Sequence, residues 1–242
     1  MNILVTGGAS GIGAAIAARL ASHGDHLVYL TYYTSKASAD ALAAEHGNIR
    51  PICCNFLERS SVDALLETMD GMDLNGLVNN AIPGLHIAHF HKMPISQVEA
   101  GFHAYLLPVI AITQRAIAQF RKRRHGRIVT VLTSHLAGSP PVGLSEYVAS
   151  KAYLGSLAKS WAVENASLGI TSNCVSPSMV HTRLLAGIAP HVVAQAEESS
   201  PLRRLLTAAE VAETVEFLLC ASPFINGVNL FMNAAEDVVQ VP

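Results

Sequence analysis

The fold of this chain is decided by the stretch Thr6-Gly7-Gly8-Ala9-Ser10-Gly11-Ile12-Gly13. It follows the apolar residues 3–5 and leads directly into the alanine-rich residues 14–20, which predicts a short buried strand, a glycine-rich turn and a helix. Glycines in the turn allow a tight bend and leave room for a ligand against the backbone. The helix would direct its free N–H groups and positive dipole end at the turn, where a pyrophosphate binds well. The G-x-x-x-G-x-G spacing therefore indicates a dinucleotide site, although such a turn can also serve packing alone.

The length and composition of the chain indicate one α/β domain spanning residues 1–242. Hydrophobic residues make up 50% of the sequence and charged residues 14%, which excludes a disordered chain and predicts extensive burial. The formal net charge of −2 argues against a dedicated nucleic-acid-binding protein. The four cysteines form no C-x-x-C pair, so we expect reduced thiols in a cytoplasmic protein. Because no secretion signal and no apolar run of about 18 residues is evident, we expect neither export nor a membrane partner.

Short apolar segments alternate with helical segments along the whole chain. Besides residues 3–5, strands are expected at 27–32, 49–54, 76–81, 127–134, 171–175 and 228–232. Helices are expected at 37–46, 60–69, 96–120 (with a kink or break at Pro108), around 147–151 and at 208–219. This order predicts a doubly wound parallel sheet of about seven strands with helices on both faces and a ligand site beyond the carboxyl ends of the strands. Residues 178–206 are expected to form a variable substrate lid.

Three side chains suggest the chemistry of the predicted site. Tyr147 and Lys151 are four residues apart, so they lie on one face of a helix. A nearby ammonium favours the phenolate and lowers the phenol pKa towards the range useful for proton transfer. Ser134, at the end of the preceding predicted strand, is expected to hydrogen-bond a substrate oxygen that Tyr147 protonates.

These features together resemble the short-chain dehydrogenase/reductase family in its single-domain form. The chain is most similar to 3-oxoacyl-ACP reductases and related polyketide or fatty-acid ketoreductases. The matching segments, which span nearly the whole chain, are residues 6–13, Asn79-Asn80-Ala81, Ser134, residues 147–151, and Ser176-Pro177 with Thr182.

The resemblance implies a Rossmann-like fold and hydride transfer between a nicotinamide cofactor and a carbonyl or alcohol carbon. Tyr147 would be the proton donor, Ser134 would orient and polarise the oxygen, and Lys151 would hold the nicotinamide ribose. The substrate would be a small-molecule or acyl-carrier-bound carbonyl compound. The residues expected to bind the cofactor are Gly7, Ser10, Gly11, Ile12, Gly13, Tyr33, Thr34, Asn55, Asn80, Ala81, Tyr147, Lys151, Pro177 and Thr182.

Several positions depart from the family pattern. Ile82 and Ser178 stand where the family has glycine, Asn55 stands for an aspartate, and residues 233–235, Asn-Ala-Ala, stand for Asp-Gly-Gly. These departures favour an alternative to a working enzyme, namely a catalytically impaired reductase-like protein that binds a ligand or partner through the same pocket. A reductase with an unusual or bulky substrate is a further alternative.

The largest departure lies in the long predicted helix. By its spacing, the family's relay asparagine corresponds to Tyr105. A tyrosine would displace the water that the asparagine holds or would carry the proton relay through its own hydroxyl. Tyr105 is therefore either a catalytic residue or a packing residue.

The cofactor choice depends on the end of the second predicted strand. An acidic residue there would bind the ribose 2′-OH of NAD and repel a 2′-phosphate, and none is present in residues 31–36. The arginine typical of NADP users is also missing, which leaves Thr34, Ser35 and Lys36 as candidate phosphate contacts. NADP(H) is thus favoured over NAD(H).

The remaining polar clusters favour simpler interpretations. The spacing of His86, His89, His91 and His103 matches no common zinc pattern, so no metal site is expected, whereas His135 is a candidate for substrate contact. The basic run 121–125 is expected to cap a helix C-terminus. Helix 109–120 and the helix of Tyr147 have the apolar character of subunit surfaces, and the family resemblance implies a homodimer or homotetramer.

Overall fold

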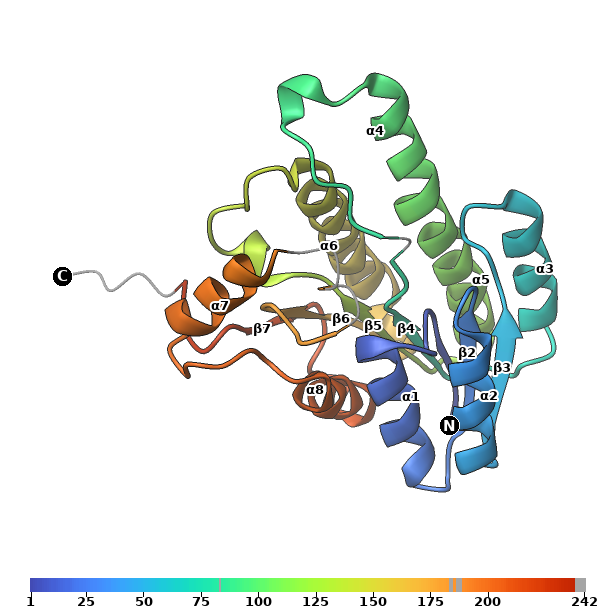
Figure 1. Ribbon diagram of the computed structural model, residues 1–242. Coiled ribbons are helices and arrows are strands. Elements are labelled where there is room, and N and C mark those ends of the chain that lie inside the picture. The colour runs from blue at the N-terminus through green and yellow to red at the C-terminus, as the bar shows by residue number, and fades with distance from the viewer. Residues whose placement is uncertain (83, 183–184, 186–188, 238–242) are drawn as a thin grey trace.

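The computed structural model describes residues 1–82, 84–182, 185 and 189–237 as one α/β domain (Figure 1). Its centre is a sheet of seven parallel strands in the order β3-β2-β1-β4-β5-β6-β7. The strands are β1 Asn2–Val5, β2 Leu27–Tyr32, β3 Ile49–Cys53, β4 Gly76–Asn79, β5 Gly126–Val131, β6 Ile170–Pro177 and β7 Asn229–Met232. The predicted doubly wound parallel sheet is confirmed.

Helices cover both faces of the sheet (Figure 1). One layer contains α1 and α8, which pack against each other, and the other contains α3, α5 and α6. The helices are α1 Gly11–Ser22, α2 Lys36–Glu45, α3 Arg59–Met69, α4 Ile95–Gly101, α5 Leu107–Arg123, α6 Ser145–Asn165, α7 Pro190–Ser199 and α8 Ala208–Cys220.

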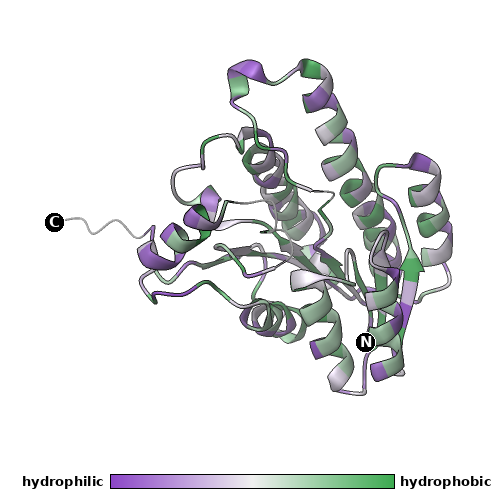
Figure 2. Ribbon diagram, viewed as in Figure 1, coloured by the Kyte–Doolittle hydropathy of each residue, from purple (hydrophilic) through white to green (hydrophobic). Residues whose placement is uncertain are grey.

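Strand β1 shows why the core is apolar on both sides of the sheet. Ile3 and Val5 pack into the α1 and α8 layer, whereas Leu4 packs into the α3 and α5 layer. All three side chains are fully buried, because successive residues of a strand point to opposite faces. The central strands are accordingly hydrophobic in Figure 2, whereas α7 carries mostly hydrophilic residues.

Strand ends differ from the predicted ones where the functional side chains begin. Strand β5 ends at Val131, so Ser134 belongs to the short helical turn η3, Ser134–Leu136, that follows it. Strand β6 continues to Pro177, two residues beyond the predicted end. The predicted lid, 178–206, contains α7 and a bridge between Val180 and Leu206, but residues 183–184 and 186–188 of it lie outside the described residues.

The long predicted helix is divided. Helix α4 ends at Gly101, a π-helical turn η2 spans Phe102–Leu106, and α5 begins at Leu107 with Pro108 in its first turn, where proline is tolerated. Taken together, Ile95–Arg123 is the one stretch of the described chain with the length and apolar composition of a membrane-crossing helix. Polar residues interrupt this stretch, so a search of the sequence for uninterrupted apolar runs does not find it. Ile112 and Phe120 are fully buried against α3 and the sheet, as in the core helix of a folded domain.

The basic run 121–125 closes α5, and Arg124 rather than Gly126 adopts the capping conformation. Arg124 is left-handed, with φ of 52°, and its side chain donates to the Ser167 carbonyl at 3.0 Å. Arg123 donates to the Leu74 carbonyl at 2.8 Å. Gly126 instead begins β5 against the ring of Phe120. These two arginine side chains bind carbonyl groups outside α5, and Arg123 also pairs with Asp73, so the expected side-chain capping of the helix end is not seen for them.

Two alanines near the C-terminus keep a glycine-like backbone. Ala234 has φ of 51° and Ala235 has φ of 66°, both in the left-handed region. For a residue with a Cβ, that region costs about 1–2 kcal/mol. The backbone course associated with Asp-Gly-Gly in the family is thus compatible with Asn-Ala-Ala here, at a cost in conformational energy.

Candidate functional site

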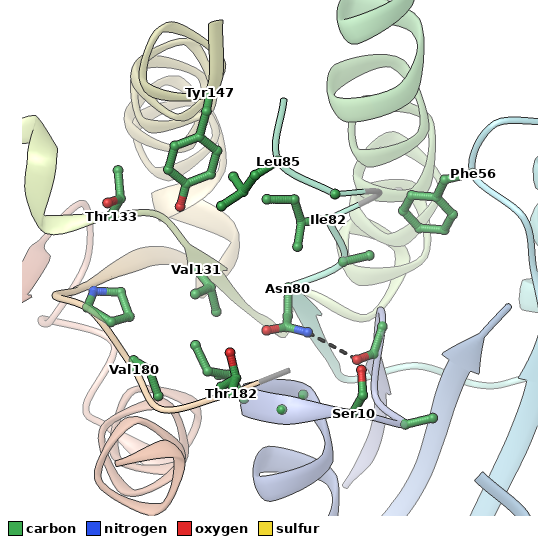
Figure 3. Close-up of a pocket in the computed structure, with 18 of the residues that line it drawn as sticks. Ser10, Phe56, Asn80, Ile82, Leu85, Val131, Thr133, Tyr147, Val180 and Thr182 are labelled. Carbon is green, nitrogen blue, oxygen red and sulfur yellow. Dashed lines mark hydrogen bonds between the residues drawn. The ribbon is translucent and has the colours of Figure 1, made fainter. Parts of the chain in front are cut away.

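An open cavity lies at the carboxyl edge of the sheet, where the strand order reverses between β1 and β4 (Figure 3). Such a switch point is where doubly wound sheets bind ligands. The loop after β1 and the ends of β2, β3, β4, β5 and β6 all contribute to its wall. Every residue predicted to bind the cofactor lines this cavity.

The glycine turn is closely packed and fits a phosphate group. Gly7 and Gly11 have positive φ values of 64° and 52°. A Cβ on Gly13 would lie 2.1 Å from the Gly7 carbonyl oxygen, so only glycine fits there. Ser10 is the N-cap of α1 and its side chain makes no capping hydrogen bond. The first N–H groups of α1 therefore face the cavity as an anion-binding helix end.

Two side chains from other segments complete the turn. The Asn80 amide donates to the carbonyls of Thr6 at 2.9 Å and Gly7 at 3.2 Å, which ties the end of β4 to the turn. Thr182 packs over Gly11 from the lid, since a Cβ on Gly11 would lie 3.2 Å from its side chain. The turn, the strand end and the lid thus enclose the space that a dinucleotide pyrophosphate would occupy.

The predicted adenosine contacts lie where β2 and β3 end. Tyr33, Thr34 and Asn55 line the cavity. The Asn55 side chain is already bonded within its own loop, donating to the Glu58 carboxylate at 2.9 Å and accepting from the Leu57 N–H at 3.1 Å. It lines the site, but its polar atoms also organise the start of α3.

At the Tyr147 end of the cavity, one predicted residue does not line the wall. Ser134 is buried and is absent from the described cavity wall, whereas Thr133 lines it beside Tyr147 (Figure 3). Val131, Leu132, Thr133 and His135 line the cavity, whereas Ser134 begins the helical turn η3 and does not. No spacing in the sequence distinguishes Thr133 from Ser134.

Tyr147 and Lys151 lie close together, as the helical spacing predicted. The Lys151 Nζ lies 5.9 Å from the centroid of the Tyr147 ring and donates to the Val131 carbonyl at 2.7 Å. Burial lowers the pKa of Lys151 to about 8.

The phenol pKa differs from the expectation. Burial raises the pKa of Tyr147, and a hydrogen bond with Thr133 offsets this only in part. The predicted net depression of the phenol pKa is therefore not found, because desolvation of the phenolate is the largest effect. The Thr133 side chain lowers this pKa by less than burial raises it.

Tyr105 stands outside the cavity wall formed by the described residues. Its hydroxyl donates to the carbonyl of Gly84, and burial raises the pKa of the phenol. Gly84 itself lines the cavity, together with Ile82 and Leu85.

The apolar part of the wall was not predicted. Ile82 and Leu85 lie across the cavity from Thr133, and Leu144 and Met179 add further apolar surface (Figure 3). Loop hydrophobic residues have no periodic spacing that would reveal their direction. His135, the candidate for substrate contact, also lines the cavity, and burial lowers its pKa while Asp237 and Glu236 oppose this effect. Among the described residues, no group of three or more histidine, cysteine or acidic side chains is arranged to hold a metal ion.

Comparisons with known proteins agree with this geometry. A family model described as enoyl-(acyl carrier protein) reductase matches residues 7–234. The 3-oxoacyl-[acyl-carrier-protein] reductase MabA of Mycobacterium avium is 32% identical, with 90% of this chain and 82% of the relative covered. The 3-oxoacyl-[acyl-carrier-protein] reductase FabG of Aquifex aeolicus is also 32% identical, with 89% of this chain and 88% of the relative covered.

Solved structures with a similar fold cover nearly the whole chain. A protein described as a short chain dehydrogenase/reductase family protein superposes with a TM-score of 0.85 at 30% identity, covering 99% of this chain and 98% of that one. A putative gluconate dehydrogenase from Agrobacterium tumefaciens has a TM-score of 0.87 at 21% identity, covering 99% and 96% of the two chains, and shows the shared fold.

The lowered pKa of Lys151 predicts a pH dependence of stability. Between about 8 and the ordinary value of 10.5, the unfolded chain binds the lysine proton and the folded chain does not. Stability of the natural chain relative to Lys151→Met should therefore rise with pH across this window, by up to about 3 kcal/mol. Urea unfolding at several pH values between 7 and 10.5 measures this difference. Lys159→Met, an exposed lysine on the same helix, is the matched control. A difference that stays constant over the window would contradict the lowered pKa.

Proposed function

This chain belongs to the short-chain dehydrogenase/reductase family of nicotinamide-dependent oxidoreductases, and we propose that it reduces carbonyl compounds of the 3-oxoacyl type with NADP(H). The observation that carries the proposal is a single cavity that joins the glycine turn of α1 to the hydroxyl of Tyr147. An apolar wall borders the same cavity at the Tyr147 end.

The proposed mechanism assigns each polar side chain one task. Bound reduced nicotinamide supplies the hydride. Tyr147 donates its proton to the substrate carbonyl oxygen, and the Thr133 hydroxyl hydrogen-bonds that oxygen in the role first assigned to Ser134. The Lys151 ammonium, held on the Val131 carbonyl, stabilises the negative charge left on the phenol ring oxygen. Burial of Thr133 and Lys151 strengthens these interactions.

The preference for NADP(H) is supported by the end of β2. The cavity wall there consists of Tyr32, Tyr33, Thr34 and Ser35, with no carboxylate among these described residues. Ser35 is the N-cap of α2 and its side chain makes no capping hydrogen bond. The Lys36 ammonium lies nearby, paired with Asp40 at 2.7 Å. Hydroxyl donors, a helix N-terminus and a lysine suit a 2′-phosphate better than a ribose hydroxyl.

The substrate class is supported by the apolar wall and by the relatives. Ile82, Leu85, Leu144 and Met179 offer an aliphatic chain a surface without polar groups to desolvate. The relatives MabA and FabG are named as 3-oxoacyl-[acyl-carrier-protein] reductases. A 3-oxoacyl chain, carried by a small thioester or by a carrier protein, fits both observations.

Ile82 favours a second candidate function. Its side chain enters the cavity at a position where the family has glycine, and it narrows the space between the two ends of the site. A reductase-like protein that binds a ligand without turnover is the function this observation supports. Binding of a cofactor without reduction of any 3-oxoacyl thioester would favour it.

Fluorescence titration with NADPH and NADH tests the cofactor. We expect NADPH to bind at least about tenfold more tightly, and Thr34→Asp to weaken NADPH binding while sparing NADH, because a carboxylate repels the 2′-phosphate. Tighter binding of NADH by the natural chain would overturn the preference. Failure to bind either nucleotide would overturn the proposal that this chain is a reductase.

Paired variants test the catalytic assignment with a generic 3-oxoacyl thioester. Tyr147→Phe should abolish turnover, and Thr133→Val should lower kcat about a hundredfold through loss of a hydrogen bond to the developing charge. Ser134→Ala is the matched control and should retain activity, because its hydroxyl lies outside the cavity wall. The reverse order for Thr133 and Ser134 in steady-state kinetics would restore the original assignment.

We also propose that the chain forms a homodimer or homotetramer through α5 and α6. Leu107, Tyr153 and Val163 expose 37%, 44% and 81% of their surface on these helices, which is costly for apolar side chains. Sedimentation equilibrium should give a multiple of 25.6 kDa that falls towards this value in Val163→Glu. A natural chain that sediments as a monomer at all concentrations would refute the assembly.

A further inference from the structure

We propose that Tyr105 is a positioning residue that fixes the cavity wall at Gly84 and Leu85, and thereby sets the fit of the substrate chain. The inference rests on the proposed reductase function for its effect on catalysis. The positioning of residues 84–88 by Tyr105 does not depend on that function and can be tested without turnover.

The first support is the hydrogen bond of Tyr105. Its hydroxyl donates to the Gly84 carbonyl, and Gly84 has a φ of 145° that favours glycine. Gly84 and Leu85 line the cavity, whereas Tyr105 is half-buried behind them. The Leu85 side chain points into the cavity on the side facing Tyr147 (Figure 3). The tyrosine thus acts on the site through the backbone of its neighbour.

The segment is also held at its other end. The Ala88 N–H donates to the Gly143 carbonyl at 3.0 Å, in the loop that precedes α6. Gly143 has a φ of 86° and lies against Ile87, because a Cβ there would come within 2.9 Å of the isoleucine side chain. Residues 84 and 88 are therefore both anchored, and Leu85 lies between the two anchors.

Tyr105 is itself placed relative to the catalytic helix. Glu146, directly before Tyr147 in α6, packs its carboxylate onto Gly101 at the end of α4, where any Cβ would collide with it. Tyr105 lies one helical turn beyond Gly101 in the π-helical turn η2. The contact therefore sets the distance between the helix of Tyr147 and the segment that carries Tyr105.

Tyr105 and Lys151 hydrogen-bond to different carbonyl groups of the described chain. A phenol has one proton to donate, and this one is donated to Gly84. Lys151 donates to the Val131 carbonyl at 2.7 Å. Burial raises the pKa of Tyr105, which keeps the phenol protonated for the Gly84 carbonyl. The Tyr105 hydroxyl is thus engaged with the cavity-lining segment, as a positioning role requires.

The variant Tyr105→Phe tests the proposal because it keeps the ring and removes only the hydroxyl. We expect the KM for an apolar 3-oxoacyl thioester to rise about tenfold, as for the loss of one buried hydrogen bond, with kcat and its pH profile unchanged. Amide hydrogen exchange of residues 84–88 should become at least about tenfold faster. Tyr29→Phe, a half-buried tyrosine of β2 away from the cavity wall, is the matched control.

A second variant perturbs the placement while keeping the hydroxyl. Gly101→Ala displaces Glu146 and with it the Tyr105 segment, so it should raise KM in the same direction. A fall in kcat with a shifted pH profile and unchanged KM in Tyr105→Phe would instead assign Tyr105 to proton transfer. Unchanged exchange at residues 84–88 would overturn the positioning role. Because exchange needs no turnover, that result separates failure of this inference from failure of the proposed reaction.

Discussion

The site depends on the hydrogen bonds that join Thr6 to the end of β4. The Thr6 hydroxyl accepts from the N–H groups of Asn80 at 2.9 Å and Ala81 at 3.0 Å, and it donates to the Val78 carbonyl at 3.2 Å. The Asn80 amide returns to the Thr6 and Gly7 carbonyls. These bonds join the ends of β1 and β4 at the point where the strand order of the sheet reverses. The glycine turn keeps its shape because buried polar groups on both sides of this junction satisfy one another.

Backbone constraints explain why so much could be predicted from the sequence. Gly7, Gly11 and Gly13 are required by a tight local turn of the main chain, and such a turn is recognisable from the spacing of its glycines in the sequence. Tyr147 and Lys151 report a helical period in the same way. The alternation of strands and helices then determines where these segments meet, because parallel strand ends share one edge of the sheet. The fold and the cofactor side of the cavity follow from such signals.

The substrate side of the cavity is shaped by tertiary contacts, which produce no regular spacing of residues in the sequence. Thr133 and Ser134 are both hydroxyl residues that follow β5, and nothing in their positions along the sequence distinguishes the one that lines the cavity. Leu85 faces the cavity because its neighbours are anchored by Tyr105 and Gly143, which are distant in sequence. Desolvation is equally invisible to the sequence, and it reverses the expected direction of the Tyr147 pKa.

The departures from the family pattern affect two separable properties of the cavity. Ala234 and Ala235 retain a left-handed backbone, so losing glycine there changes the conformational energy more than the course of the chain. Ile82, by contrast, adds side-chain volume inside the cavity beside Leu85. In the proposed mechanism, proton transfer depends on Tyr147, Thr133 and Lys151, which are placed by α6 and by the segment that follows β5. The volume left for a ligand depends instead on the segment that follows β4. A change in that segment therefore alters which molecules fit while leaving the proton-transfer groups in place.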